Sequence, residues 1–142
     1  MKILVPVDGS KSSLAGARMA ADLAKAQGAE VTLLAVVPAY SDIDLEISAR
    51  ARDSLEGKLN AAAAQAIDQS KGLLAGISLK SFVVSSNDIA DEIIKMAEDE
   101  GFDLIVLGSR GRKPAGRFTV GGTALKVVSH SPCSVLVAKT AE

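Results

Sequence analysis

The chain has 142 residues, of which 48% are hydrophobic and only 3% are aromatic, and its formal net charge is −1. A chain of this size and apolar content folds as a single domain, residues 1–142, that buries roughly 68–70% of its unfolded surface. Because charges of both signs are interspersed and few aromatic rings are available to stack on bases, nucleic acid is excluded as an expected partner.

Targeting signals and disulfides are not expected. The apolar run at residues 3–7 is too short for a signal peptide, and no later segment approaches the length of a membrane span. The single cysteine, Cys133, cannot form an internal disulfide, which fits a reducing compartment. We therefore expect a cytoplasmic protein with no membrane partner.

The first predicted elements are a strand and a helix. The continuous apolar run Ile3 to Val7 indicates a strand buried on both faces, and Pro6 fits its last turn, where the hydrogen-bonded ladder stops. A helix then begins at an N-cap serine, either Ser10 or Ser12, and ends before Gly28.

A second strand and a long helix follow. The β-branched run Val31 to Val37 predicts a strand, which completes a βαβ unit. From about Asp42 to Lys71 apolar residues recur every four positions, which is typical of an amphipathic helix, with a loop at Tyr40 to Asp44.

The remaining elements alternate in the same way. Asp88 is the predicted start of a helix that Gly101 ends. The other predicted elements are strands at Ile77 to Val84, Leu104 to Leu107 and Ser134 to Val137, and a short helix at Thr123 to Ser129. Five short apolar strands separated by helices predict a three-layer α/β/α sandwich with a parallel sheet and right-handed crossovers.

A ligand crevice is expected at the carboxyl ends of these strands, where the strand order reverses. If the first and fourth strands are neighbours at this point, Asp8 and Gly108 face each other across the crevice. The residues that follow each strand are therefore the candidates for binding.

The stretch after the fourth strand has the composition of a phosphate-binding loop. Gly108, Gly111 and Gly121 have the spacing G-x2-G-x9-G, and each lets backbone approach a ligand or adopt a positive φ. A helix starting at Gly121 to Thr123 directs backbone N–H groups and a positive dipole end at an anion. Ser109 and Thr123 add hydroxyl groups, and the nearby cations are Arg110, Arg112, Lys113 and Arg117.

The other end of the crevice suits a nucleoside. Asp8 is a carboxylate that accepts hydrogen bonds from ribose hydroxyls, and adenine needs an apolar slot. Val7, Val36, Val37 and Leu107 are the residues expected to supply that slot. The full set of candidate ligand-binding residues is Pro6, Val7, Asp8, Val36, Leu107, Gly108, Arg110, Gly111, Arg112, Gly121, Gly122 and Thr123.

Plainer interpretations remain for the same residues. Glycines after strands are ordinary turn residues, Asp8 could have no role other than capping the next helix, and arginines in a loop often form a solvated face.

Two known nucleotide motifs are excluded. Gly116 to Thr123 has the frame of a Walker A loop but carries glycine in place of its lysine, and GxGxxG is absent.

Three blocks of the chain resemble the universal stress protein family: Ile3 to Ser10, Asp103 to Gly111 and Ser131 to Val137. The resemblance implies a Rossmann-like sheet in the order 3-2-1-4-5 and a homodimer formed through the last strand, Ser134 to Ala138. It also implies an ATP-binding signature, G-x2-G-x9-G-[S/T], which Gly108, Gly111 and Gly121 match here, and a binding aspartate that carries over to Asp8. The last position is Gly122, so that the hydroxyl of Thr123 comes one residue late.

These observations lead to three functional hypotheses. The first is a nucleotide-responsive stress or regulatory module that binds ATP, or AMP or ADP, with Mg2+ bound to the phosphates. The second is a dimeric interaction protein of the same family that binds no nucleotide and acts on an unidentified protein partner. The third is a slow ATP-hydrolysing enzyme, for which no catalytic constellation is evident, since His130 is the only histidine and no metal-ligand spacing occurs.

Overall fold

The computed structural model describes residues 1–39, 49–110 and 120–140. The predicted loop at Tyr40 to Asp44 lies outside these residues, as does the start of the predicted long helix. The elements in chain order are β1 (Lys2–Pro6), α1 (Lys11–Gln27), β2 (Glu30–Val37), α2 (Ala49–Lys71), β3 (Leu79–Ser85), α3 (Ile89–Glu100), β4 (Leu104–Gly108), α4 (Gly122–His130) and β5 (Ser134–Ala138).

Helices α1 and α3 begin and end at the residues that the sequence predicts. Ser10, and not Ser12, is the N-cap of α1, and its side chain accepts a hydrogen bond from the backbone N–H of Ser13. Asp88 caps α3 in the same way, accepting from Asp91. Both helices end at a glycine with positive φ, +65° at Gly28 and +66° at Gly101, a conformation that glycine adopts without steric cost.

The third strand starts later than the apolar pattern suggests. The predicted strand began at Ile77, whereas β3 begins at Leu79. The backbone N–H of Ile77 donates to the carbonyl of Leu74 at 3.1 Å, which holds residues 74–77 in a turn after α2. Ile77 still packs against the core from this turn.

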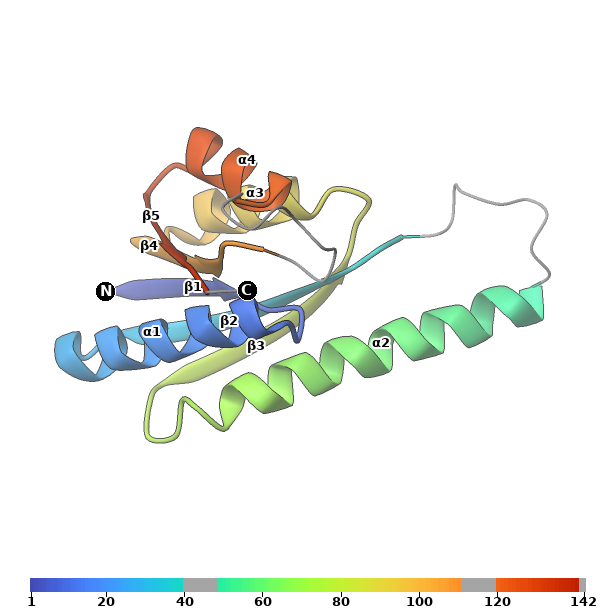
Figure 1. Ribbon diagram of the computed structural model, residues 1–142, viewed down its shortest axis with the longest axis horizontal. Helices are drawn as coiled ribbons and strands as arrows, with labels where there is room; N and C mark the ends of the chain where they lie inside the picture. The colour runs from blue at the N-terminus through green and yellow to red at the C-terminus, as the bar shows by residue number, and fades with distance from the viewer. Residues whose placement is uncertain (40–48, 111–119, 141–142) are drawn as a thin grey trace.

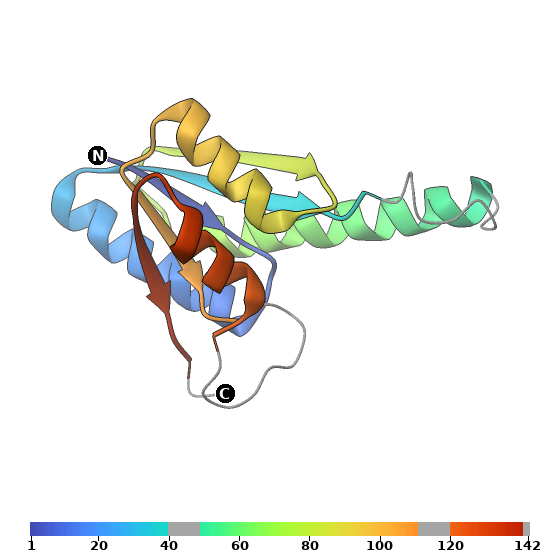
Figure 2. The ribbon, with the colours of Figure 1, turned by 90° about the horizontal axis from the view of Figure 1, so that it is seen from above.

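The five strands form one parallel sheet in the order β3-β2-β1-β4-β5, which confirms the predicted fold class. Helices α1 and α2 cover one face of the sheet, and α3 and α4 cover the other (Figures 1 and 2). Alternate residues of each strand therefore enter two separate cores. None of the helices in the described part of the chain has the length and apolar content needed to cross a bilayer.

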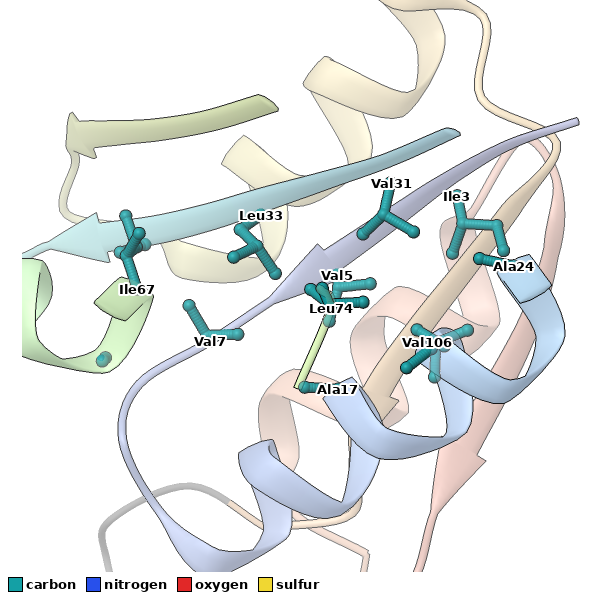
Figure 3. Close-up of a cluster of buried hydrophobic side chains, with 14 of the residues drawn as sticks. Ile3, Val5, Val7, Ala17, Ala24, Val31, Leu33, Ile67, Leu74 and Val106 are labelled. Carbon is teal, nitrogen blue, oxygen red and sulfur yellow. The ribbon is translucent and has the colours of Figure 1, made fainter. Parts of the chain in front are cut away.

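The core under α1 and α2 is built from small helix residues and larger strand residues. Figure 3 shows Val5 and Val106 of the sheet close to Ala17 of α1, and Leu33 on the side toward Ile67 of α2. Alanines on the buried face of α1 bring this helix close to β1 and β4, because they add no side-chain bulk beyond Cβ. This close approach matters at the carboxyl end of β4, where the candidate site begins.

Candidate functional site

Strand β1 lies between β2 and β4, so that the chain order reverses at β1. It pairs with β2 through Lys2 to Pro6 and with β4 through Ile3 and Leu4. The connection after β1 leads to α1 on one face, and the connection after β4 leads to α4 on the other (Figure 1). The structure thus confirms that the first and fourth strands are neighbours at a switch point, which is where ligands bind in sheets of this type.

Asp8 organises the turn between β1 and α1. Its Oδ1 accepts a hydrogen bond from the backbone N–H of Ser10 at 2.9 Å, and its own N–H donates to Oγ of Ser13 at 3.1 Å. Asp8 therefore does not cap α1 directly, because Ser10 does so. The side chain of Asp8 is exposed, and a carboxylate accepts several hydrogen bonds at once.

Gly108 is glycine because α1 lies against it. A Cβ placed on Gly108 would lie 2.5 Å from the carbonyl carbon and Oγ of Ser12 and 2.6 Å from its carbonyl oxygen. The sequence argument assigned this glycine to the approach of a ligand or to a positive φ. The backbone that approaches it is instead the first turn of α1.

Gly121 and Gly122 differ from Gly108 in their surroundings. Gly121 is the N-cap of α4, with extended backbone at φ −63° and ψ 158°, so it does not use the positive φ that is open to glycine. A Cβ added at Gly122 would meet no atom of the described residues within 4 Å. Packing among the described residues therefore does not require glycine at position 122, and Gly122 is exposed.

The two described ends of the connection between β4 and α4 are joined. The N–H of Gly121 donates to the carbonyl of Ser109 at 2.6 Å, and the N–H of Ser109 donates to the carbonyl of Ala138 at 2.8 Å. The N–H of Arg110 donates to Oγ of Ser12 at 3.1 Å. Two further candidates, Gly111 and Arg112, lie outside the described residues.

The N-terminus of α4 has the properties of an anion site. The N-cap of α4, Gly121, makes no side-chain cap hydrogen bond, whereas the side-chain oxygens of Ser10 and Asp88 cap α1 and α3. The N-cap residue Gly121 thus offers no side-chain acceptor to the first N–H groups of α4, and the helix dipole adds a partial positive charge there. Thr123 is exposed in the first turn of the same helix.

A shallow cleft of about 360 Å³ lies beside this helix end, and it faces the connection between β3 and α3. Its lining residues are Asn87, Asp88, Ile89, Ala90, Gly122, Thr123 and Lys126. The sequence analysis included Gly122 and Thr123 among the candidates but did not include Lys126. Nothing in the local sequence relates Lys126 to Asp88, because the two residues are 38 positions apart.

Lys126 joins α4 to the start of α3 through two carboxylates. Its Nζ lies 2.7 Å from Oδ2 of Asp88 and 3.1 Å from Oδ1 of Asp91. The hydrogen bond from Lys126, followed by that from the backbone of Asp91, lowers the pKa of Asp88 below its usual value. The same contact with Asp88 raises the pKa of Lys126, so both groups are charged at neutral pH.

The four valine and leucine residues predicted to form one apolar slot are divided between the faces of the sheet. Val7 and Val37 are buried in the core under α1 and α2. Val36 and Leu107 pack into the core under α3 and α4. Successive side chains of a strand point to opposite faces, so the neighbours Val36 and Val37 cannot line the same surface. Pro6 is half-buried at the end of β1.

The remaining polar candidates do not form a catalytic group. His130 is exposed at the end of α4, with Nδ1 3.1 Å from the carbonyl of Lys126. Cys133 is half-buried against the core under α3 and α4. Within residues 1–39, 49–110 and 120–140, no three His, Cys, Asp or Glu side chains are close enough to hold a metal ion together.

The sequence profile described as "Universal stress protein family" matches residues 1–139. The chain belongs to the universal stress protein family. A universal stress protein of Methanocaldococcus jannaschii is 30% identical over 139 residues, which cover 97% of this chain and 81% of that protein. The solved structure of universal stress protein UspA from Lactobacillus plantarum is 33% identical, with a TM-score of 0.79 and 97% of each chain covered.

Two further solved structures share the fold at lower identity. One is a universal stress protein in complex with cAMP, with a TM-score of 0.70, 23% identity and coverage of 100% of this chain and 98% of that chain. The other is a family protein from Arabidopsis thaliana with AMP bound, with a TM-score of 0.68, 17% identity and coverage of 98% and 91%.

Proposed function

We propose that this universal stress protein binds an adenine nucleotide, ATP or else AMP or ADP, and acts as a nucleotide-responsive regulatory module. The observation that carries the proposal is the N-terminus of α4, which has no side-chain cap and is hydrogen-bonded through Gly121 to Ser109 at the switch point. The family members with cAMP and AMP bound support the same ligand class, since both ligands combine adenine with a phosphate group.

The phosphates would lie against the first turn of α4. The N–H groups of Gly122 and Thr123 are the donors there, and the half-buried Arg110 at the other end of the connection adds positive charge. Gly111 is the second glycine of the sequence signature and Arg112 follows it, so both remain proposed ligand-binding residues on sequence grounds. Mg2+, where it accompanies ATP, would be held by phosphate oxygens, because the described residues offer no cluster of acidic or histidine ligands.

The nucleoside would lie toward the end of β1. Asp8 is exposed there and accepts from ribose hydroxyls, in addition to the N–H of Ser10. Of the residues proposed for the adenine slot, Val36 and Leu107 face the same side of the sheet as α4. They are therefore better placed than Val7 to contact a nucleotide whose phosphates lie at that helix.

The departure at Gly122 sets the expected affinity. Gly122 offers only its N–H, and the hydroxyl of Thr123 lies one residue further along the first turn. A charge-assisted hydrogen bond contributes about 1.5–3 kcal/mol, so losing one would weaken the hold on the last phosphate. ADP and AMP would then compete well with ATP.

The second candidate function is a dimeric interaction protein that binds no nucleotide. Strand β5 favours a dimer, because it lies at the edge of the sheet and pairs only with β4 among the described strands. An apolar edge strand of this kind is usually covered, and a second copy related by a two-fold axis would cover it. A slow ATP-hydrolysing enzyme is the third candidate function. A cytoplasmic location and a further protein partner stay predictions.

A direct binding experiment separates the first two candidates. The purified protein is denatured, the released small molecules are identified, and fresh protein is titrated calorimetrically with ATP and Mg2+ and with AMP. The proposal predicts a released adenine nucleotide or a binding heat at micromolar to millimolar concentration. If no nucleotide is released and no binding heat is seen at millimolar ATP, nucleotide binding is excluded and the nucleotide-free interaction protein is the remaining candidate.

A matched pair of variants tests the role of Asp8. Asp8→Asn keeps one side-chain oxygen for the N–H of Ser10 but removes the charge and one acceptor oxygen. Asp22→Asn makes the same chemical change at an exposed position of α1. The affinity for nucleotide should fall about tenfold in Asp8→Asn, as expected for one charge-assisted hydrogen bond, and should not change in Asp22→Asn.

A further inference from the structure

Three serines near the start of α1 have three different partners. Ser10 caps the helix by accepting from the N–H of Ser13. Ser13 accepts from the N–H of Asp8 and so holds the connection after β1. Ser12 is the second residue of α1, and its hydroxyl turns away from its own helix toward the connection after β4.

The hydroxyl of Ser12 is buried, with the residue 4% exposed, and it reaches across to two consecutive residues. Its Oγ accepts from the backbone N–H of Arg110 at 3.1 Å. It also lies 3.5 Å from Oγ of Ser109, which is long for a hydrogen bond between hydroxyls, so the bond to Arg110 is the stronger link. These partners are 97 and 98 positions away in the sequence.

Glycines make this link geometrically feasible. Gly108 has no Cβ, which would otherwise lie 2.5 Å from Ser12. One turn later in α1, a Cβ on Gly16 would lie 3.3 Å from the N of Gly108 and the carbonyl carbon of Leu107. The backbones of α1 and β4 are thus in contact at the point where β4 ends.

The bond also acts on the far end of the connection. Ser109 accepts from the N–H of Gly121, the N-cap of α4. Ser12 holds the N–H of Arg110, which belongs to the same peptide group as the Ser109 carbonyl, and that carbonyl holds Gly121. The position of the α4 N-terminus relative to Arg110 therefore depends on a hydroxyl that belongs to α1.

We propose that Ser12 is a positioning residue of the nucleotide site, which fixes the spacing between Arg110 and the N-terminus of α4. The inference rests on the proposed function in its effect on affinity, but its structural part can be measured without ligand. Ser12 makes no contact with nucleotide in this account. Its effect is to keep Arg110 and the first N–H groups of α4 ready for the same phosphate chain.

The test compares Ser12→Ala with Ser70→Ala. Ser70 is also buried, and its hydroxyl donates to the carbonyl of Ala66 at 2.9 Å within α2, in the helix layer that covers the sheet face opposite α4 (Figure 1). Both variants remove one buried hydroxyl with little change in volume. Amide hydrogen exchange of Arg110 is measured by NMR without ligand, ATP and AMP affinities are measured by calorimetry, and unfolding is followed by circular dichroism.

Ser12→Ala should increase the exchange rate of the Arg110 amide at least tenfold and weaken nucleotide binding about fivefold, the effect of one neutral hydrogen bond. Ser70→Ala should change neither. An unchanged Arg110 exchange rate in Ser12→Ala would overturn the inference, and so would faster exchange with unchanged affinity. Absence of nucleotide binding by the wild-type protein would overturn the proposed function instead. The Arg110 exchange rate would then decide by itself whether Ser12 holds the connection.

Discussion

Gly108 and Gly122 belong to the same sequence signature, yet replacing them with alanine should have opposite effects on stability. In Gly108→Ala the new methyl group is placed 2.5 Å from the carbonyl carbon and Oγ of Ser12 and 2.6 Å from its carbonyl oxygen. Two of these three atoms are helix backbone, so rotating a side chain cannot relieve the contact. In Gly122→Ala the methyl group meets no atom within 4 Å among the residues that the structure describes.

The magnitudes follow from these surroundings. Overpacking a close contact costs about 1–3 kcal/mol, and a backbone contact belongs at the upper end, so Gly108→Ala should lose about 3 kcal/mol of unfolding free energy. Its melting temperature should fall by roughly 6–12 °C. Gly122→Ala should gain about 0.4–1 kcal/mol, because alanine restricts the unfolded chain and fits the first turn of α4.

Urea unfolding followed by circular dichroism measures both effects, since the chain has no tryptophan to report by fluorescence. The slope of free energy against urea concentration should be the same in all three proteins, so that midpoints compare directly. Equal losses of stability in the two variants, or a loss confined to Gly122→Ala, would refute the assignment of Gly108 to packing against α1.

Three further predictions concern α4, the phosphate end and the sheet edge. Lys126→Met should lower stability slightly at pH 7. Because Lys126 lowers the pKa of Asp88, this contribution to stability is present above the unfolded-state pKa of about 4 and is lost as the pH falls through the lower folded-state pKa. The urea midpoints of wild type and Lys126→Met should therefore differ at pH 7 and converge as the pH is lowered through that range, and a constant difference would contradict the ion pair. Gly122→Ser should strengthen ATP binding about fivefold in calorimetry while Gly122→Ala does not, and equal affinities would exclude a hydroxyl contact at this position. Light scattering at micromolar concentration should give the mass of a dimer, and a monomer would contradict pairing through Ser134–Ala138.

The residues at which α1 and α3 begin and end were predictable because their sequence signals are local. Ser10 and Asp88 are short polar residues directly before apolar periodic segments, and Gly28 and Gly101 directly follow them. The alternation of strand and helix gave the parallel sheet. The strand order was expected only through the family resemblance, because neither strand length nor composition determines which strands pair.

The contacts that hold the candidate site were not predictable, because they join distant parts of the chain. The bond from Arg110 to Ser12 and the ion pair of Lys126 with Asp88 depend on how α1 and α4 lie against the sheet. The division of the apolar slot was a different kind of error. Consecutive strand residues such as Val36 and Val37 point to opposite faces, and applying that rule to the sequence would have separated them.

The central claim is that the switch point binds an adenine nucleotide, and an NMR titration of the isotope-labelled protein with ATP and Mg2+ tests it most directly. The account predicts saturable amide shifts at the carboxyl ends of β1 and β4 and at the start of α4. The residues concerned are Asp8, Gly108 to Arg110 and Gly121 to Thr123. Saturable shifts elsewhere would contradict the site, for example around Lys2 and Phe102 at the opposite ends of the strands. No shifts at millimolar ATP would contradict nucleotide binding itself.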